Sequence, residues 1–411
     1  MAVISPFRAL RPEPSRAAQV ASPPYDVVNT DEARQLAKDN PYSFLHVSRP
    51  EIDLPAGTDI YSDQVYAKAA ENFRRLIEIC PLKTDDAPTL YLYRQVMNEN
   101  AQTGIVACCS IDEYDDNLIL KHEKTRPDKE DDRTRHIIET RAQTGPVFLT
   151  YRGREEINSL VDEATTREPH EPLYDFTADD NIRHTIWIAS DAANLARAFR
   201  EVERLYIADG HHRAASASRA RAELKSKNHH HTGDEEYNRF LAVLFPSDQL
   251  RILPYNRIVR DLGGFSPEEF LAKVKEKFSV TEDAPPVPER RGQWSMYLNK
   301  RWHKLTLKDN AAKTADPVAS LDVSILQDNL LDPILGIKDV RTDKRIDFVG
   351  GVRGANELAR LVDEGKAAVA FSLFPTTLDD LLRVSDAGSV MPPKSTWFEP
   401  KLRDGLLIHC I

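Results

Sequence analysis

The stretch RLYIADGHHRAASASRARAEL, residues 204–224, decides the fold class. A short apolar run at 205–208 reaches a glycine, Gly210, and passes at once into a segment of helix-forming residues. This order is typical of a strand that leads into a helix through a glycine turn. The turn also holds Asp209, His211, His212 and Arg213, and a strand-to-helix connection does not by itself require these residues.

The residues of this turn indicate an anion site. The first N–H groups of a helix have no partner inside it and lie at the positive end of its dipole. Gly210 permits a close approach to the backbone, the planar fork of Arg213 matches phosphate oxygens, and His211 and His212 offer further donors. We therefore expect a cradle for phosphate or sulfinate, in which Asp209 orients a histidine or holds Mg²⁺. The alternative is a capped helix start whose two histidines face solvent.

The neighbouring segments predict an α/β or α+β protein with mixed sheets and flanking helices. Residues 183–190 and 239–246 are strand candidates on either side of the turn, and 89–96 with 103–111 form a predicted hairpin. Helices are predicted at 61–79, at 32–38 with Thr30 and Asp31 as caps, and after Ser266. We expect three parts: residues 1–150 with a charged loop, a core at 151–260 that carries the turn, and 261–411 with a rigid tail.

Composition narrows the class of protein. The chain has 411 residues, of which 41% are hydrophobic, and its four cysteines are too few and too irregularly spaced for a disulfide framework. No stretch resembles a signal peptide or reaches the roughly 18 apolar residues of a membrane helix, so a soluble cytoplasmic protein is expected. The net charge of −10 argues against a nucleic-acid partner. The oligomeric state stays open.

Four stretches carry a resemblance to a known family. They are SPPYDVV (22–28), HEKTRPDKEDDR (122–133), IADGHHRAASA (207–217) and MPPKSTWFEPKLRDGLL (391–407). Together they resemble the domain of unknown function 1015 (DUF1015), a large uncharacterised family often labelled ParB-like. The IADGHHR string is similar to the phosphate-binding signature of the ParB/sulfiredoxin superfamily, which includes free-serine kinases.

The resemblance implies a ParB/sulfiredoxin-like core, and the sequence removes two branches of the superfamily. His211 stands where sulfiredoxins need a cysteine, and no helix-turn-helix follows as it does in ParB partition proteins. The kinase branch implies ATP or ADP with Mg²⁺, gripped by the histidine–arginine turn, and a small hydroxylated acceptor, by resemblance serine or phosphoserine. The reaction direction stays open.

Further site residues are expected at three other places. Glu123, directly after an apolar run, is the expected base, with Asp132 and Arg133 as second candidates; the alternative is a solvated charge run. The stiff tail presents Lys394, Ser395 and Thr396, and also Lys401, to phosphate, unless it only straps the chain to the core. Tyr25, Asp26 and Arg133 are expected at the substrate.

These residues together predict a phosphotransferase that acts on a small hydroxylated metabolite. Two alternatives remain from the sequence: a phosphoesterase that uses the same cradle, and a non-catalytic ParB-like protein that associates with nucleotide or DNA. Phosphoryl transfer mainly requires positioning and charge neutralisation, with a carboxylate that accepts the hydroxyl proton and cations that hold the phosphate.

Overall fold

The structure is a computed structural model that describes residues 2–166, 171–308 and 315–411. The described chain forms two compact units. The first comprises the chain up to Lys121, Thr125–Leu250 and Pro400–Ile411, and the second comprises His122–Lys124 and Arg251–Glu399. The last twelve residues therefore return to the unit in which the chain begins.

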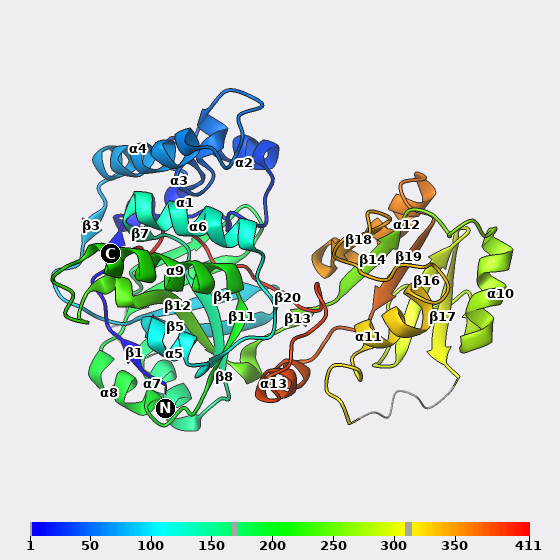
Figure 1. Ribbon diagram of the computed structural model, residues 1–411. Coiled ribbons are helices and arrows are strands. Elements are labelled where there is room, and N and C mark those ends of the chain that lie inside the picture. The colour runs from blue at the N-terminus through cyan, green and yellow to red at the C-terminus, as the bar shows by residue number, and fades with distance from the viewer. Residues whose placement is uncertain (1, 167–170, 309–314) are drawn as a thin grey trace. The chain divides into compact units, whose positions relative to one another are not determined.

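A mixed sheet forms the centre of the first unit, which agrees with the expected α/β class (Figure 1). Its order is β6 (Ile119–Leu120), β11 (Leu205–Asp209), β8 (Val147–Tyr151), β12 (Arg239–Pro246), β5 (Asn100–Ser110), β4 (Tyr91–Met97), β10 (Arg183–Ile188) and β9 (Tyr174–Thr177), and β1 (Ile4–Ser5) also pairs with β5. The pairs β6–β11 and β8–β12 are parallel and the others are antiparallel. The expected part boundary near residue 150 falls at the end of β8, inside this sheet.

The local patterns explain the strands. The predicted hairpin is present as β4 and β5, and Asn98 in its turn has a φ of 56°, a left-handed conformation that asparagine tolerates. The apolar run 239–246 forms β12, which lies between β8 and β5 and is buried over nearly its whole length. A continuous apolar run is what a strand covered on both faces requires.

Helices are layered on the sheet beside β11. The helix α9 (His211–Lys227) packs on β8 and β12, α6 (Pro127–Thr140) packs on α9, and α4 (Asp63–Ile79) packs on α6 (Figure 1). The remaining helices are α1 (Ala17–Val20), α2 (Thr30–Ala37), α3 (Leu45–Ser48), α5 (Ile111–Asp115), α7 (Glu155–Thr166) and α8 (Ala192–Phe199). The expected caps of α2 were wrong, because Asn29 is its N-cap and forms a capping box with Glu32.

The second unit has an antiparallel sheet of its own. Its order is β15 (Phe278–Glu282), β17 (Arg301–Leu307), β16 (Gln293–Leu298), β19 (Val369–Leu373), β14 (Tyr255–Val259) and β18 (Ile346–Gly350). The helices are α10 (Pro267–Lys277), α11 (Asp322–Leu326), α12 (Gly354–Asp363) and α13 (Leu378–Asp386). The helix predicted after Ser266 is confirmed as α10, with Ser266 as its N-cap and Glu269 completing the capping box.

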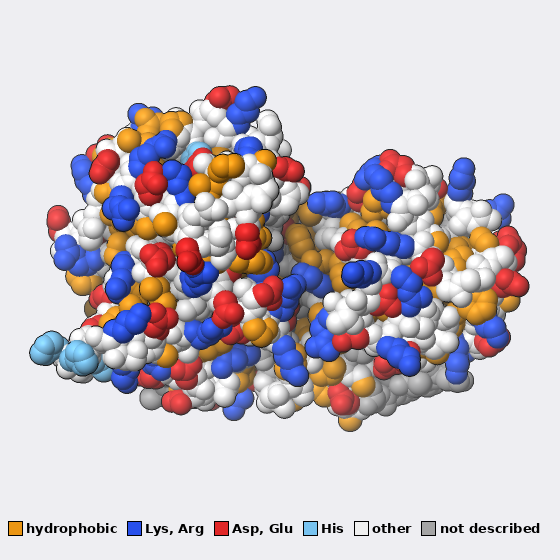
Figure 2. All heavy atoms as spheres, turned by 45° about the horizontal axis from the view of Figure 1, so that its top comes forward, with side chains coloured by type: hydrophobic (Ala, Val, Ile, Leu, Met, Phe, Trp, Pro, Cys, Tyr) orange, Lys and Arg blue, Asp and Glu red, His pale blue; other side chains and the backbone are white. Residues whose placement is uncertain are grey.

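Two surface properties bear on possible partners. Among the described helices, none combines the length and the apolar character needed to cross a membrane. Basic and acidic side chains alternate over the face in Figure 2, and neither sign forms a continuous area there. On that face the charge pattern gives no stripe of the kind that nucleic-acid backbones select.

Candidate functional site

The glycine turn is built as the sequence predicts. Gly210 is the N-cap of α9 with a φ of 89°, a left-handed conformation that strains any other residue. Because glycine has no side chain, no N-cap side chain accepts from the first N–H groups of α9. His211, His212 and Arg213 form the first turn of the helix and do not precede it.

The start of α9 lies beside the start of α6. The backbone N–H of Arg126, the N-cap of α6, donates to His212 Nε2 at 3.0 Å, and one turn further on Ser216 Oγ donates to the carbonyl of Glu130 at 3.1 Å. Both contacts advance by four residues on each helix, so the two helices run parallel and begin at the same level. Their positive ends are therefore adjacent. The two helix dipoles repel each other there unless an anion or an acidic side chain lies near both ends.

His212 acts as a link between these two helix starts. Its Nε2 accepts a hydrogen bond, so the imidazole is neutral and carries its proton on Nδ1. Burial lowers the pKa of His212, and the charges of Lys129 and Arg126 lower it further, against the opposing charges of Asp26 and Glu130. Of the two ring nitrogens of His212, only Nδ1 is available to donate a hydrogen bond to a phosphate.

Asp209 is paired with Lys401 from the returning C-terminal segment. Lys401 Nζ lies 2.9 Å from one carboxylate oxygen, and the N–H of Gly210 donates to the other at 2.8 Å. Burial by itself would raise the pKa of Asp209, but the positive charges of Lys401 and Arg213 hold that pKa well below its usual range. Both oxygens of this carboxylate are engaged, so Asp209 does not fit as a Mg²⁺ ligand.

A metal site would need several ligands placed together. Within residues 2–166, 171–308 and 315–411, no group of three His, Cys, Asp or Glu side chains is placed to hold a metal ion. We therefore derive no step of a reaction through a protein-bound Mg²⁺.

Arg213 and His211 are directed differently from the expectation. Arg213 is only 9% exposed and His211 only 5%. The guanidinium of Arg213 folds back beneath Gly210, where a Cβ would lie 3.0 Å from its Nε, and one terminal nitrogen donates to the carbonyl of Pro146. The prediction that Arg213 presents its fork to an external phosphate was wrong in this respect, because the fork is buried.

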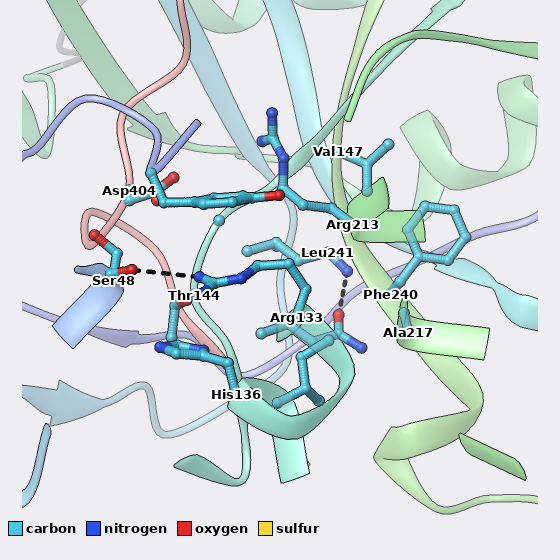
Figure 3. Close-up of a pocket in the computed structure, with 14 residues that line it drawn as sticks. Ser48, Arg133, His136, Thr144, Val147, Arg213, Ala217, Phe240, Leu241 and Asp404 are labelled. Atoms are coloured by element: carbon cyan, nitrogen blue, oxygen red, sulfur yellow. Dashed lines mark hydrogen bonds between the residues drawn. The ribbon is translucent and has the colours of Figure 1, made fainter. Parts of the chain in front are cut away.

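Arg213 lines a small cavity inside the first unit (Figure 3). The cavity has a volume of about 30 Å³. Tyr25 and Arg133, both expected at a substrate, also line it, and the Arg133 guanidinium lies 4.1 Å from the centre of the Tyr25 ring. Arg133 is already neutralised by Asp132 at 2.9 Å and donates to the carbonyl of Ser48 at 3.3 Å.

Asp404, which the sequence reasoning missed, completes this cavity. It is 2% exposed, and one of its oxygens, Oδ1, has no hydrogen-bond partner among the described residues. Burial raises the pKa of Asp404 to about 7, although the charges of Arg213, Arg133 and Arg403 oppose that shift. The resemblance of the tail around LRDG was the only sequence signal that pointed to this residue.

A buried network fixes the segment that carries Asp404. Arg403 Nε donates to His184 Nε2 at 3.2 Å, and a second nitrogen of Arg403 pairs with Asp180. The other nitrogen of His184 lies 2.7 Å from the hydroxyl of Tyr93. The backbones of Ser22 and Asp404 also bond to each other. These contacts hold in place the segment that carries both Lys401 and Asp404.

Asp26, expected at the substrate, is exposed in the first unit, and the remaining expected site residues lie in the second unit. Glu123 is partly exposed, and Lys394 is exposed with a φ of 61°. Ser395 is buried and donates to the carbonyl of Pro392 at 2.6 Å, whereas Thr396 lies 3.5 Å from His122 Nε2. The expectation that Ser395 contacts phosphate conflicts with this bond, because its hydroxyl proton is used inside the loop.

Comparisons with known proteins give a family and several structural relatives. No curated protein matches the chain. A free serine kinase mutant in complex with AMP is similar at 13% identity over 72% of this chain and 87% of its own, with a TM-score of 0.35. The protein SbnI from Staphylococcus aureus, C-terminally truncated, matches at 10% identity over 72% of this chain and 82% of its own, with a TM-score of 0.37.

A conserved hypothetical protein from Pyrococcus furiosus matches at 12% identity over 73% of this chain and 94% of its own, with a TM-score of 0.35. At TM-scores this low, the likeness carries no argument about activity. The family model described as "Protein of unknown function (DUF1015)" matches residues 4–324, most of the chain. The chain therefore belongs to the DUF1015 family, as its four landmark stretches indicated.

Proposed function

We propose that this protein is a phosphotransferase that binds the phosphates of ATP or ADP at the paired starts of α6 and α9 and phosphorylates a small hydroxylated metabolite. The observation that carries the proposal is the hydrogen bond from Arg126 N–H to His212, which holds two parallel helix starts side by side. A phosphate at that place would interact favourably with both positive helix ends.

The charges around the paired helix starts support an anion there. No N-cap side chain accepts from the first N–H groups of α9, and His212 keeps an Nδ1–H donor. Lys401 neutralises Asp209, so the carboxylate next to the turn does not repel a phosphate as a free charge would. Of the residues that the sequence assigned to phosphate, Gly210 and His212 keep that role here, and Arg213 supports it from beneath.

The proposed reaction is a direct transfer. The acceptor hydroxyl oxygen forms a bond to the terminal phosphorus, the bond from that phosphorus to the nucleotide oxygen breaks, and the hydroxyl proton goes to a carboxylate. Glu123, the base that the sequence predicts, is the first carboxylate to test. L-serine is the first acceptor to test, by the family resemblance, and the reverse reaction from phosphoserine is part of the same test.

The test uses the full chain with nucleotide labelled at its terminal phosphate and L-serine as acceptor. We expect labelled phosphoserine, and we expect Glu123→Gln to slow its formation at least a hundredfold without changing nucleotide affinity. Lys401→Gln leaves the Asp209 charge unpaired beside the phosphates and should weaken nucleotide binding about tenfold, or ~1.4 kcal/mol.

The matched control is Lys83→Gln, which removes a lysine from a surface ion pair with Glu13 in the same unit. Nucleotide affinity that is equal in the Lys401 and Lys83 variants would refute the proposed phosphate position. Phosphate release from phosphoserine without nucleotide would indicate a phosphoesterase instead. Nucleotide binding without any turnover would indicate a nucleotide-binding protein without catalytic function.

A further inference from the structure

The cavity beneath the glycine turn is lined by two charged groups that each have a buried atom without a partner, and by Ser48, whose Oγ also has no partner among the described residues. Arg213 Nε and Asp404 Oδ1 have no hydrogen-bond partner among the described residues, and both side chains line the cavity (Figure 3). A buried polar atom without a partner costs about 1–3 kcal/mol, and more when the group is charged. Two such atoms at one cavity indicate that something outside the chain occupies it.

The size of the cavity limits what that occupant is. A space of about 30 Å³ exceeds the roughly 10–15 Å³ that one water molecule needs on the same measure. A water molecule or a small planar oxyanion is of this order of size, whereas a nucleotide is far larger. A nucleotide does not fit into the cavity, so the cavity is distinct from the proposed nucleotide position at the starts of α6 and α9.

The charge of the cavity distinguishes between water and an anion. Arg213 is buried, and the carboxylates of Asp26, Asp209 and Asp404 act on it only through space; among the described residues, none forms an ion pair with it. Arg133 does not change this balance, because Asp132 already neutralises it. A water molecule would satisfy hydrogen bonds but would leave the buried guanidinium of Arg213 without an anion in direct contact.

We propose that this cavity binds a small monovalent oxyanion, which accepts from Nε–H of Arg213 and from the carboxyl group of Asp404 in its protonated form. The ligand is a single planar carboxylate group, of which formate is the smallest example. Its source is either a free anion or the carboxylate of a small metabolite whose remaining atoms extend from the cavity. This proposal does not depend on the phosphotransferase activity.

Binding of the anion requires a proton on Asp404. With Asp404 ionised, an anion would meet a second negative charge within the cavity, so the complex forms by uptake of one proton from solvent. The titratable and charged groups that act on Asp404 or line its cavity are Arg213, Arg133, Arg403, Asp26, Tyr25 and His136. Burial lowers the pKa of His136 to about 4 and raises that of Tyr25 above its usual range, so neither changes charge near neutral pH.

Isothermal titration of the full chain with sodium formate, at ionic strength held constant with sodium chloride, tests the proposal. Because the pKa of Asp404 lies at about 7, formate should bind about fiftyfold more weakly at pH 9 than at pH 7. Titrations in buffers of different ionisation enthalpy should show close to one proton taken up per formate at pH 9. Glycolate and L-serine, compared with formate, then separate a free anion from a metabolite carboxylate.

Two substitutions test the position of the site. Asp404→Asn keeps the shape and a donor but cannot titrate, so formate binding should persist and lose its pH dependence. Gly145→Ala should abolish formate binding, because the added Cβ would lie 2.7 Å from Asp404 Oδ1. Asp322→Asn is the matched control, since Asp322 is a buried carboxyl of the other unit whose pKa is also raised, to about 6.

The outcomes decide the proposal in either direction. Wild-type protein that binds no formate at pH 7 would mean that water alone fills the cavity, and the proposal fails. An Asp404→Asn variant that keeps the wild-type pH dependence, or an Asp322→Asn variant that loses it, would place the anion elsewhere. Nucleotide binding, measured separately on the same variants, reports on the proposed function and is not expected to follow formate binding.

Discussion

Replacement of Gly210 by alanine tests the construction of the glycine turn most directly. Its φ of 89° would place an alanine in the left-handed region, which costs about 1–2 kcal/mol. The new Cβ would also lie 3.0–3.3 Å from three atoms of the Arg213 guanidinium, so this group must shift by a few tenths of an ångström. Its buried hydrogen bond to Pro146 would weaken, and bonds of charged groups contribute about 1.5–3 kcal/mol.

The two effects together predict a loss of about 2–4 kcal/mol in the free energy of opening at the start of α9. Gly57→Ala provides the matched control, because Gly57 has a φ of 85° in the same unit and an added Cβ there would meet no atom within 4 Å. The control therefore reports the backbone strain alone. The difference between the two variants isolates the Arg213 contact.

Native-state hydrogen exchange followed by mass spectrometry is the appropriate assay, because it measures opening at each segment separately. In the Gly210→Ala variant, peptides from the start of α9 should exchange faster than in wild type. This acceleration should be at least tenfold larger than the acceleration that Gly57→Ala causes in peptides around residue 57. Equal effects of the two substitutions would refute the reasoning that Arg213 is packed against the turn.

Three further predictions concern the contacts around this site and one buried acid of the second unit. His212→Phe removes the acceptor of the Arg126 N–H and should destabilise the first turn of α6 by about 0.5–1.5 kcal/mol, visible as faster exchange there, whereas unchanged exchange would contradict the link between the helices. Arg403→Met leaves buried His184 without its donor and should destabilise the first unit by about 2–3 kcal/mol in urea unfolding, a prediction that fails if the midpoint does not move. Burial raises the pKa of Asp322 to about 6 against the opposing effects of the Gly292 N–H and Arg291, so the folded state holds this proton more tightly than the unfolded chain; the stability that it contributes is complete below about pH 4 and is lost as pH rises through 6. Asp322→Asn should flatten that slope in thermal unfolding followed across this range, and an unchanged slope would assign it to another group.

The sequence predicts the local elements well because their determinants lie close together in the chain. The apolar run 239–246 is long enough and bounded enough to define a buried strand, and Ser266 with Glu269 defines a helix start by a capping box. The error at α2 has the same local character: Asn29 precedes the two caps that were predicted, and three adjacent residues of similar capping ability compete for one position.

The candidate site could be predicted only in part. The strand, the glycine and the helix are continuous in sequence, so the left-handed turn at Gly210 and the helix that follows it are determined locally. The direction of the Arg213 side chain is not, since a guanidinium at a helix start can point outward to a ligand or back beneath the turn. The carbonyl of Pro146, 67 residues away, decides between these directions.

What the sequence by itself determined is therefore the family, the order of the elements and the presence of an anion-favouring turn. Only the tertiary structure brought Tyr25, Arg133, Arg213 and Asp404 to one cavity, and only it placed the start of α6 beside that of α9. The physical reason is that helical and strand periodicity determine which face of an element is buried, whereas the partner on that face depends on how distant segments pack. Asp404 illustrates this: it becomes a site residue because the last twelve residues return to the unit in which the chain begins, where the backbones of Ser22 and Asp404 pair.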